Sequence, residues 1–199
     1  MHLLVLNGVE RDTIPRSIQL IAGRTGQEYN QRKNRNGAFW EDRYHATAVQ
    51  TNEHLIKCIT YIDLNMVRAG VSKHPQKWIH SGYNEIQRPR QRYGIIDFKN
   101  LMALLQVENI VDLKEAHREW IEAALKKSKV VRESKWTQSI AVGDKPFLKQ
   151  IKERLGIRAK GRMIHGSEDA YQLREGQTNY GAWQDLDNNN TFDWNLANK

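Results

Sequence analysis

The sequence predicts an α+β fold with a mainly helical C-terminal part, and three observations lead to this prediction. Residues 2–6 are almost all apolar, as in a strand that is buried on both faces. Residues 38–50 are rich in aromatic and β-branched side chains, which favours extended structure. Apolar side chains recur at helical spacing in five further segments, which are residues 13–34, 52–68, 97–105, 112–127 and 144–155.

The two N-terminal helices have recognisable ends. Thr13 and Pro15 open the first, and Gly37 stops it, whereas Thr51 caps the second and Gly70 ends it. The first helix is expected to turn an apolar stripe inward, formed by Ile14, Ile18, Ile21, Ala22 and Thr25.

Length and composition limit the class of protein. The chain has 199 residues, which suits one ordinary domain or a small domain with an appendage. No apolar run approaches the roughly 20 residues that cross a bilayer, so we expect no membrane partner. Cys58 is the only cysteine, which excludes an internal disulfide framework and a multi-cysteine zinc site. A cytoplasmic protein is the expectation.

The charge distribution indicates a polyanionic partner. Basic residues outnumber acidic ones by 31 to 23, and the formal net charge at pH 7 is +8. The acidic residues gather in the tail at 168–199, so the body of the chain is more basic than the whole. Nucleic acid is the most common partner of such a protein, although many basic proteins bind nothing specific.

The helix expected at 52–68 has two contrasting faces. Its apolar face is formed by Leu55, Ile59, Ile62 and Met66. On the opposite face Tyr61 and Asn65 lie one turn apart, accompanied by His54, Lys57 and Arg68. A phenol in this setting can attack a phosphodiester, while cations hold the phosphates and an amide oxygen binds a hard metal ion. The same pattern also fits a solvated helix face with a half-exposed tyrosine.

Residues 53–71 resemble the signature helix of the single-tyrosine HUH transposases, most closely the REP-associated tyrosine transposases. Their pattern is Tyr-Ile-x-x-Asn-Pro-Val-Arg-x-Gly. The chain departs from it at Met66, where proline is commoner, and matches it at Tyr61, Ile62, Asn65, Val67, Arg68 and Gly70. Residues 37–44 resemble the family's Gly-x-x-Trp-x-x-Arg-Phe/Tyr segment, and residues 78–83 loosely resemble its Trp-x-x-Ser-x-Tyr stretch. Together these motifs cover about residues 1–85.

The resemblance implies an incomplete ferredoxin-like domain and a defined chemistry. Tyr61 would attack a phosphate in single-stranded DNA, which leaves a 5′-phosphotyrosine link and a free 3′-OH. A Mg²⁺ or Mn²⁺ ion would be bound by His2 and Asn65 among others. In the family a His-hydrophobic-His motif on a central strand holds this metal, and Met1 and His2 correspond to its last two positions. We therefore expect the first histidine and the first strands to be encoded upstream, as in a 5′-truncated gene product or a start placed at an internal Met.

The DNA implied by the resemblance is a hairpin from a palindromic repeat, with single-stranded flanks. Phosphate contacts are expected from seven basic side chains, which are Arg24, Arg32, Lys33, Arg35, Arg43, Lys57 and Arg68. Trp40 is expected to pack into the sheet, with stacking on a base as the alternative. Tyr29 is a competing nucleophile, but it continues the helical stripe, which favours a core position.

The sequence therefore predicts a transposase-type protein whose cleavage activity is impaired by the loss of a metal-binding histidine. The alternative is a non-catalytic nucleic-acid-binding protein. The expected parts are a catalytic domain at 1–95, a basic helical extension at 96–165 and a disordered acidic tail at 166–199. The basic helix at 144–155, within the helical extension, is either a further DNA contact or a solvated helix. Family members act as monomers or as dimers that exchange the tyrosine helix, so the resemblance is compatible with a homodimer.

Overall fold

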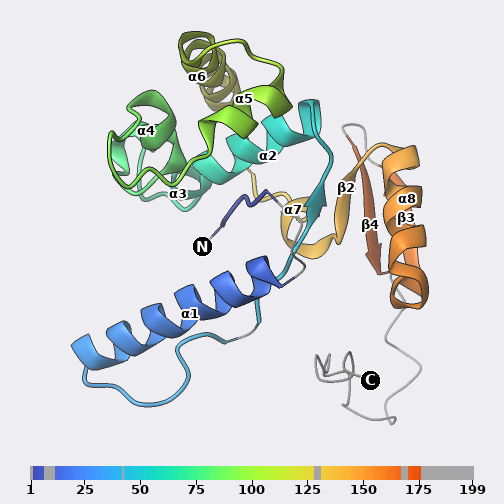
Figure 1. Cartoon of the computed structure of the whole chain (residues 1–199), viewed down its shortest axis with the longest axis horizontal. Helices are drawn as coiled ribbons and strands as arrows, with labels where there is room; N and C mark the ends of the chain where they lie inside the picture. The colour runs from blue at the N-terminus through green and yellow to red at the C-terminus, as the bar shows by residue number, and fades with distance from the viewer. Residues whose placement is uncertain (1, 7–11, 42, 128–130, 167–169, 176–199) are drawn as a thin grey trace.

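The computed structural model describes residues 2–6, 12–41, 43–127, 131–166 and 170–175, and it confirms the α+β fold class (Figure 1). The helices are α1 (Thr13–Arg32), α2 (Glu53–Asp63), α3 (Asn65–Arg68), α4 (Gly82–Gln87), α5 (Phe98–Leu105), α6 (Ile110–Lys126), α7 (Lys135–Gln138) and α8 (Lys145–Leu155), with 3₁₀ turns η1 (Pro75–Lys77) and η2 (Gly156–Ala159). The strands are β1 (Ala48–Val49), β2 (Ala141–Gly143), β3 (Arg162–Gly166) and β4 (Tyr171–Glu175).

The four short strands form one sheet in the order β1-β2-β4-β3. β1 runs parallel to β2, and the other two pairs are antiparallel. α8 packs on this sheet, where Leu148 joins Ala141 and Leu173 in a fully buried cluster (Figure 1). Gln50 and Asp144 exchange hydrogen bonds of 2.9 and 2.7 Å, which tie the end of β1 to the start of α8.

The sheet comes mainly from the C-terminal part of the chain. Residues 96–165 are mostly helical, as expected, but they also supply β2 and most of β3. The expectation of disorder from residue 166 onward is wrong for β4, whose Leu173 is fully buried against α8. β4 is polar overall, but its side chains alternate between the two faces of the sheet, and Tyr171 and Leu173 face α8. Residues 176–199 of the expected tail lie outside the described residues.

The strand expected at residues 2–6 does not form. This segment belongs to no described sheet, and the side chains from Leu3 to Leu6 are 43–54% exposed. A strand needs a neighbour for its backbone hydrogen bonds. Within the described residues no strand is paired with this segment, so its apolar composition alone does not make it a strand.

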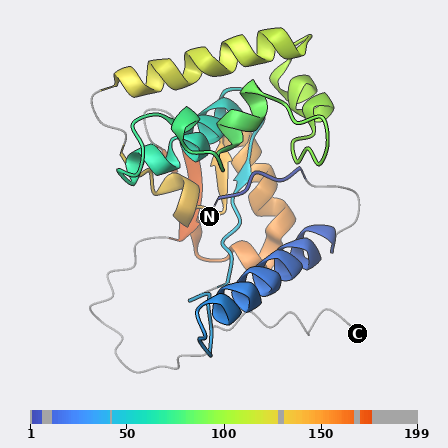
Figure 2. The same ribbon diagram turned by 90° about the vertical axis from the view of Figure 1, so that its left-hand side faces the viewer.

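α1 packs mainly against the segment that follows it and lies at the opposite end of the molecule from α6 (Figure 1, Figure 2). A Cβ added at Gly26 would lie 3.3 Å from the Cβ of Phe39, so glycine allows this close approach. The expected inner stripe is wrong in part, because Ile21 is 43% exposed and Thr25 is also exposed. No helix in the described ranges is long and apolar enough to cross a membrane.

α2 occupies the middle of the molecule and is buried on two sides. Leu55 and Ile59 pack against Leu113 of α6, whereas Cys58 and Tyr61 lie in a cluster with residues of the sheet region. The helix expected to continue to residue 68 breaks at Leu64, where ψ is 4°, and restarts as α3. The alternative of a solvated helix face with a half-exposed tyrosine is therefore wrong at Tyr61, because elements far away in sequence cover it.

A buried carboxylate joins α2 to α4 and α6. Asp63 is 5% exposed and His117 is fully buried. The Asp63 carboxylate lies 2.8 Å from His117 Nε2 and accepts a hydrogen bond of 2.8 Å from the backbone N–H of Tyr83. Buried polar groups are stable only when they are hydrogen-bonded, so these contacts fix the relative placement of the three helices.

We expect Cys58 to be unreactive toward thiol reagents in the folded protein. Its side chain is buried in the cluster that contains Tyr61 and Val142. Burial raises the pKa of the thiol to about 12, so the reactive thiolate is scarce at neutral pH. Titration with a chromogenic disulfide should show no prompt reaction in buffer and full reaction in concentrated urea. Prompt reaction of the native protein would show that α2 is not packed against the sheet region.

Candidate functional site

Tyr61 lies among side chains from three distant parts of the chain, and we call this group the tyrosine cluster; its members are His2, Tyr61, Asn65, Arg68 and Trp136. Tyr61 is only 5% exposed. The Arg68 guanidinium carbon lies 3.7 Å from the centre of its ring. The His2 ring meets it edge-on at 5.7 Å, and the Trp136 ring lies 6.0 Å away. The phenol is therefore enclosed by one cation and two aromatic rings.

Arg68 holds the cluster together from α3. Its Nη2 donates to the backbone carbonyl of Tyr61 at 2.6 Å and to Asn65 Oδ1 at 3.4 Å. Burial lowers the pKa of Arg68, and the side chains of Tyr61 and Glu133 oppose this effect. A guanidinium stacked on a ring can still direct N–H groups in its own plane at the oxygens of a phosphate. Arg68 is thus suited to hold an anion next to the phenol.

His2 contributes a neutral imidazole. Burial lowers its pKa, and the charges of Arg68 and Arg132 lower it further. Its Nδ1 is buried and has no hydrogen-bond partner among the residues that the structure describes. An unpaired buried nitrogen carries a desolvation cost, so this atom has capacity to bind a ligand.

We expect the free energy of unfolding to fall as the pH drops from 7.5 to 5.5. Burial lowers the pKa of both His2 and His54 below 6.5. The unfolded chain then takes up protons first as the pH falls through 6.5, which favours unfolding until the folded pKa values are reached. Urea unfolding at several pH values measures this slope, and the variant with both His2→Gln and His54→Gln should have a flatter one. An identical slope in that variant would contradict the assignment.

The predicted metal ligands do not complete a site for Mg²⁺ or Mn²⁺. Within the described ranges, no group of three or more His, Cys, Asp or Glu is placed to hold a metal ion. Asn65 Oδ1 faces the cationic Arg68, and His2 is also within the field of that cation. Divalent ions of this kind require several oxygen ligands, usually including carboxylates. Two neutral donors beside a guanidinium do not fit that requirement, so we derive no step through a metal.

The remaining predicted residues of α2 flank the cluster rather than enter it. Lys57 is about one third exposed, and its Nζ lies 3.6 Å from Glu53 one turn earlier. Burial lowers the pKa of His54, and Lys57 lowers it further. Both side chains stay partly accessible on α2.

Four predicted phosphate contacts lie on α1 or just after its end, away from α2 and α3, which carry most of the tyrosine cluster (Figure 1). Arg24 and Lys33 are exposed. Arg32 forms an ion pair with Glu28, and Arg35 donates to the carbonyl of Ala38 at 3.1 Å. α1 therefore presents cations to the outside, but the structure does not bring them together with Tyr61.

Trp40 neither enters the sheet nor stands free for stacking, so the expectation of packing into the sheet is wrong. It is 39% exposed, and its indole N–H donates to the carbonyl of Ala22 in α1 at 3.0 Å. Phe39 beside it meets the Tyr29 ring at 4.6 Å. Tyr29 is 40% exposed, so its expected core position is also wrong. Arg43 is exposed in the segment that leads to β1.

Sequence reasoning missed Trp136, which covers Tyr61 from the short helix α7. Its side chain is 7% exposed, and Lys135 lies over its outer face at 5.4 Å. Trp136 stands among polar side chains, between Lys135 and Thr137, and nothing local links it to α2. Compared with protein-family models, with curated proteins and with solved structures, the chain gives no match. The resemblance to the transposases therefore stays a prediction.

Proposed function

We propose that this chain is a DNA-binding protein of the single-tyrosine transposase type, which binds single-stranded or hairpin DNA and cleaves it through Tyr61. The observation that carries the proposal is the meeting of the Tyr61 ring with Arg68 at 3.7 Å and with His2 at 5.7 Å. A potential nucleophile, a cation suited to phosphate and a neutral imidazole then share one place. We expect this activity in the cytoplasm, where a single unpaired cysteine stays reduced.

The proposed reaction exchanges one phosphodiester for another. The Tyr61 oxygen forms a bond to phosphorus, and the bond from phosphorus to the 3′ oxygen of the upstream nucleotide breaks. The phenol loses a proton and the departing 3′ oxygen gains one. The downstream DNA keeps its 5′ phosphate on the tyrosine, so a new 3′-OH can reverse the step without an external energy source. Arg68 is placed to hold the phosphate oxygens during the exchange.

Access to Tyr61 requires a movement, because the side chain is 5% exposed. Trp136 covers the phenol from α7, which has only four residues. Displacement of this short helix would open the tyrosine cluster with little loss of regular structure. We therefore propose that bound DNA takes the place of Trp136 next to Tyr61.

The second candidate is a nucleic-acid-binding protein without cleavage activity. Two observations favour it, which are the burial of Tyr61 and the incomplete donor set around His2 and Asn65. Under this alternative, the basic surface binds DNA while Tyr61 acts only as a core residue.

A single gel experiment tests the two candidates. A hairpin oligonucleotide with single-stranded flanks is labelled at its 3′ end, because the proposed link retains the downstream fragment. The protein is incubated with it, with and without added Mg²⁺ or Mn²⁺, and then denatured. A labelled band at the mass of protein plus DNA, removed by protease, is the expected result. Binding in a mobility-shift assay without such a band would select the second candidate, and no binding would reject both.

A further inference from the structure

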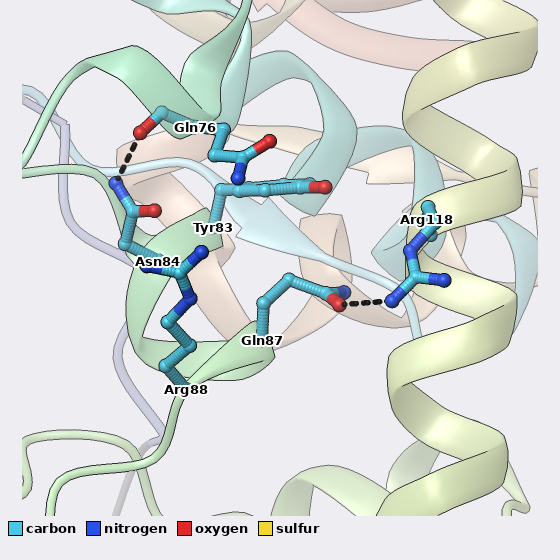
Figure 3. Close-up of a pocket in the computed structure, with 6 residues that line it drawn as sticks. All are labelled: Gln76, Tyr83, Asn84, Gln87, Arg88 and Arg118. Carbon is cyan, nitrogen blue, oxygen red and sulfur yellow. Dashed lines mark hydrogen bonds between the residues drawn. The ribbon is translucent and has the colours of Figure 1, made fainter.

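A polar pocket of about 240 Å³ lies between α4 and α6, and it shares no residue with the tyrosine cluster (Figure 3). Its walls are formed by Gln76, Tyr83, Asn84, Gln87, Arg88 and Arg118. Figure 3 shows Arg88 and Arg118 on either side of the Gln87 side chain, so two cations approach the pocket from different elements. A pocket with two guanidinium groups and no acidic wall residue suits an anion.

The two arginines are not neutralised inside the protein. Among the residues that the structure describes, neither guanidinium forms an ion pair with a carboxylate, and Arg118 donates to Gln87 Oε1 at 3.3 Å. Glu122 lies one turn after Arg118 on α6, but its carboxylate is 3.2 Å from His74. The charges of both arginines therefore remain available to a ligand.

The floor of the pocket is held rigidly by the buried core. Gln87 Nε2 donates to the carbonyl of Lys114 at 2.9 Å and lies 3.2 Å from His117 Nδ1. His117 Nε2 lies 2.8 Å from Asp63. The carboxylate accepts from Nε2–H, so Nδ1 accepts from the Gln87 amide, and Gln87 Oε1 is left to accept from Arg118 at 3.3 Å. With His117 as the neutral Nε2–H tautomer, each of these hydrogen bonds has one donor and one acceptor.

Tyr83 adds a protonated hydroxyl at the wall. Its ring is buried between the rings of His74 and His117, at 5.3 and 5.2 Å. Burial raises the pKa of Tyr83, which keeps the phenol neutral at physiological pH. A fixed guanidinium beside a fixed hydroxyl loses little freedom when an anion arrives, and such preorganisation favours binding.

We infer that this pocket binds a phosphate group, held between Arg88 and Arg118. Guanidinium groups match the geometry of phosphate oxygens and form charge-assisted hydrogen bonds with them. Such a phosphate can belong to a nucleic-acid backbone or to a small phosphorylated molecule, since the pocket recognises the group that both share. The inference does not require Tyr61 to be a nucleophile. It is therefore independent of the proposed cleavage, and either can be wrong without the other.

The test compares the variants Arg88→Gln and Arg118→Gln with Arg92→Gln. The control removes the same charge from an exposed arginine in the loop after α4, outside the pocket. Binding of a fluorescent single-stranded oligonucleotide is measured by anisotropy over a range of salt concentrations. Each pocket variant is expected to weaken binding about 5–10-fold, and to reduce the slope of log affinity against log salt by about 0.7. Arg92→Gln should change both quantities less.

A second arm identifies the source of the phosphate. The melting temperature of each protein is measured with inorganic phosphate and with chloride at matched ionic strength. Phosphate should stabilise the wild type and Arg92→Gln but not the pocket variants. A response in this arm alone would support a small phosphorylated ligand, and a response in the oligonucleotide arm would support nucleic acid. Pocket variants that behave like Arg92→Gln in both arms would overturn the inference, and equal circular dichroism spectra establish that all variants fold.

Discussion

Replacing Tyr61 by phenylalanine is expected to abolish the covalent protein–DNA adduct. The change removes only the hydroxyl oxygen, which is the atom proposed to bond to phosphorus. The ring remains, so the stacking of Arg68 at 3.7 Å and the contact with Trp136 are kept. Loss of a nucleophile lowers turnover by about 10³-fold or more in enzymes that use covalent catalysis. The amount of 3′-labelled adduct measured on a denaturing gel should therefore fall below detection, while DNA affinity changes little.

Tyr29→Phe is the matched control for this prediction. It removes the same atom from a tyrosine on α1 that is 40% exposed and is stacked on Phe39. Adduct formation should continue in this variant at the level of the wild type. If Tyr61→Phe retains the adduct, the nucleophile lies elsewhere. If Tyr29→Phe removes it, Tyr29 is the reacting residue and the proposed site is wrong.

The local chemistry of the tyrosine cluster could be predicted from sequence, but its burial could not. Helical spacing places Tyr61, Asn65 and Arg68 near each other, and Arg68 does contact both. The pairing of Tyr61 with His2 followed only from the family resemblance. Trp136 reaches Tyr61 across 75 residues, and helical periodicity contains no information about such a partner. For this reason the sequence could not show that the phenol is buried.

The same limit explains the errors in the fold. Helices α5, α6 and α8 were predictable because their apolar spacing is local and their first turns have capping side chains, which are Asp97, Asn109 and Asp144. β2 and β4 are short, and their pairing joins segments that are separated by a helix and another strand. Composition favoured the reverse arrangement, with a strand at residues 2–6 and no structure near residue 171. Hydrogen-bonding partners, rather than apolar content, determined which segment became a strand.

The buried pair of Asp63 and His117 is the interior contact with the largest expected effect on stability. Asp63 is 5% exposed and His117 is fully buried, so neither side chain can use water as a substitute partner. Asp63 also accepts the backbone N–H of Tyr83 at the start of α4. A Cβ added at Gly82 would lie 3.1 Å from the Asp63 carboxylate, which shows how closely α4 is packed against it. Removing the imidazole therefore leaves a buried carboxylate without one of its two hydrogen-bond donors.

His117→Ala is expected to lower the free energy of unfolding by about 3–5 kcal/mol. Loss of the imidazole opens a cavity between α2 and α6. It also leaves the Gln87 amide without its acceptor at Nδ1 and the buried Asp63 carboxylate without its donor at Nε2. Urea unfolding followed by circular dichroism measures the change. His80→Ala is the matched control, because His80 is exposed and its loss should change the free energy by about 0.5 kcal/mol or less. Equal effects of the two substitutions would show that Asp63 and His117 do not form a buried pair in solution.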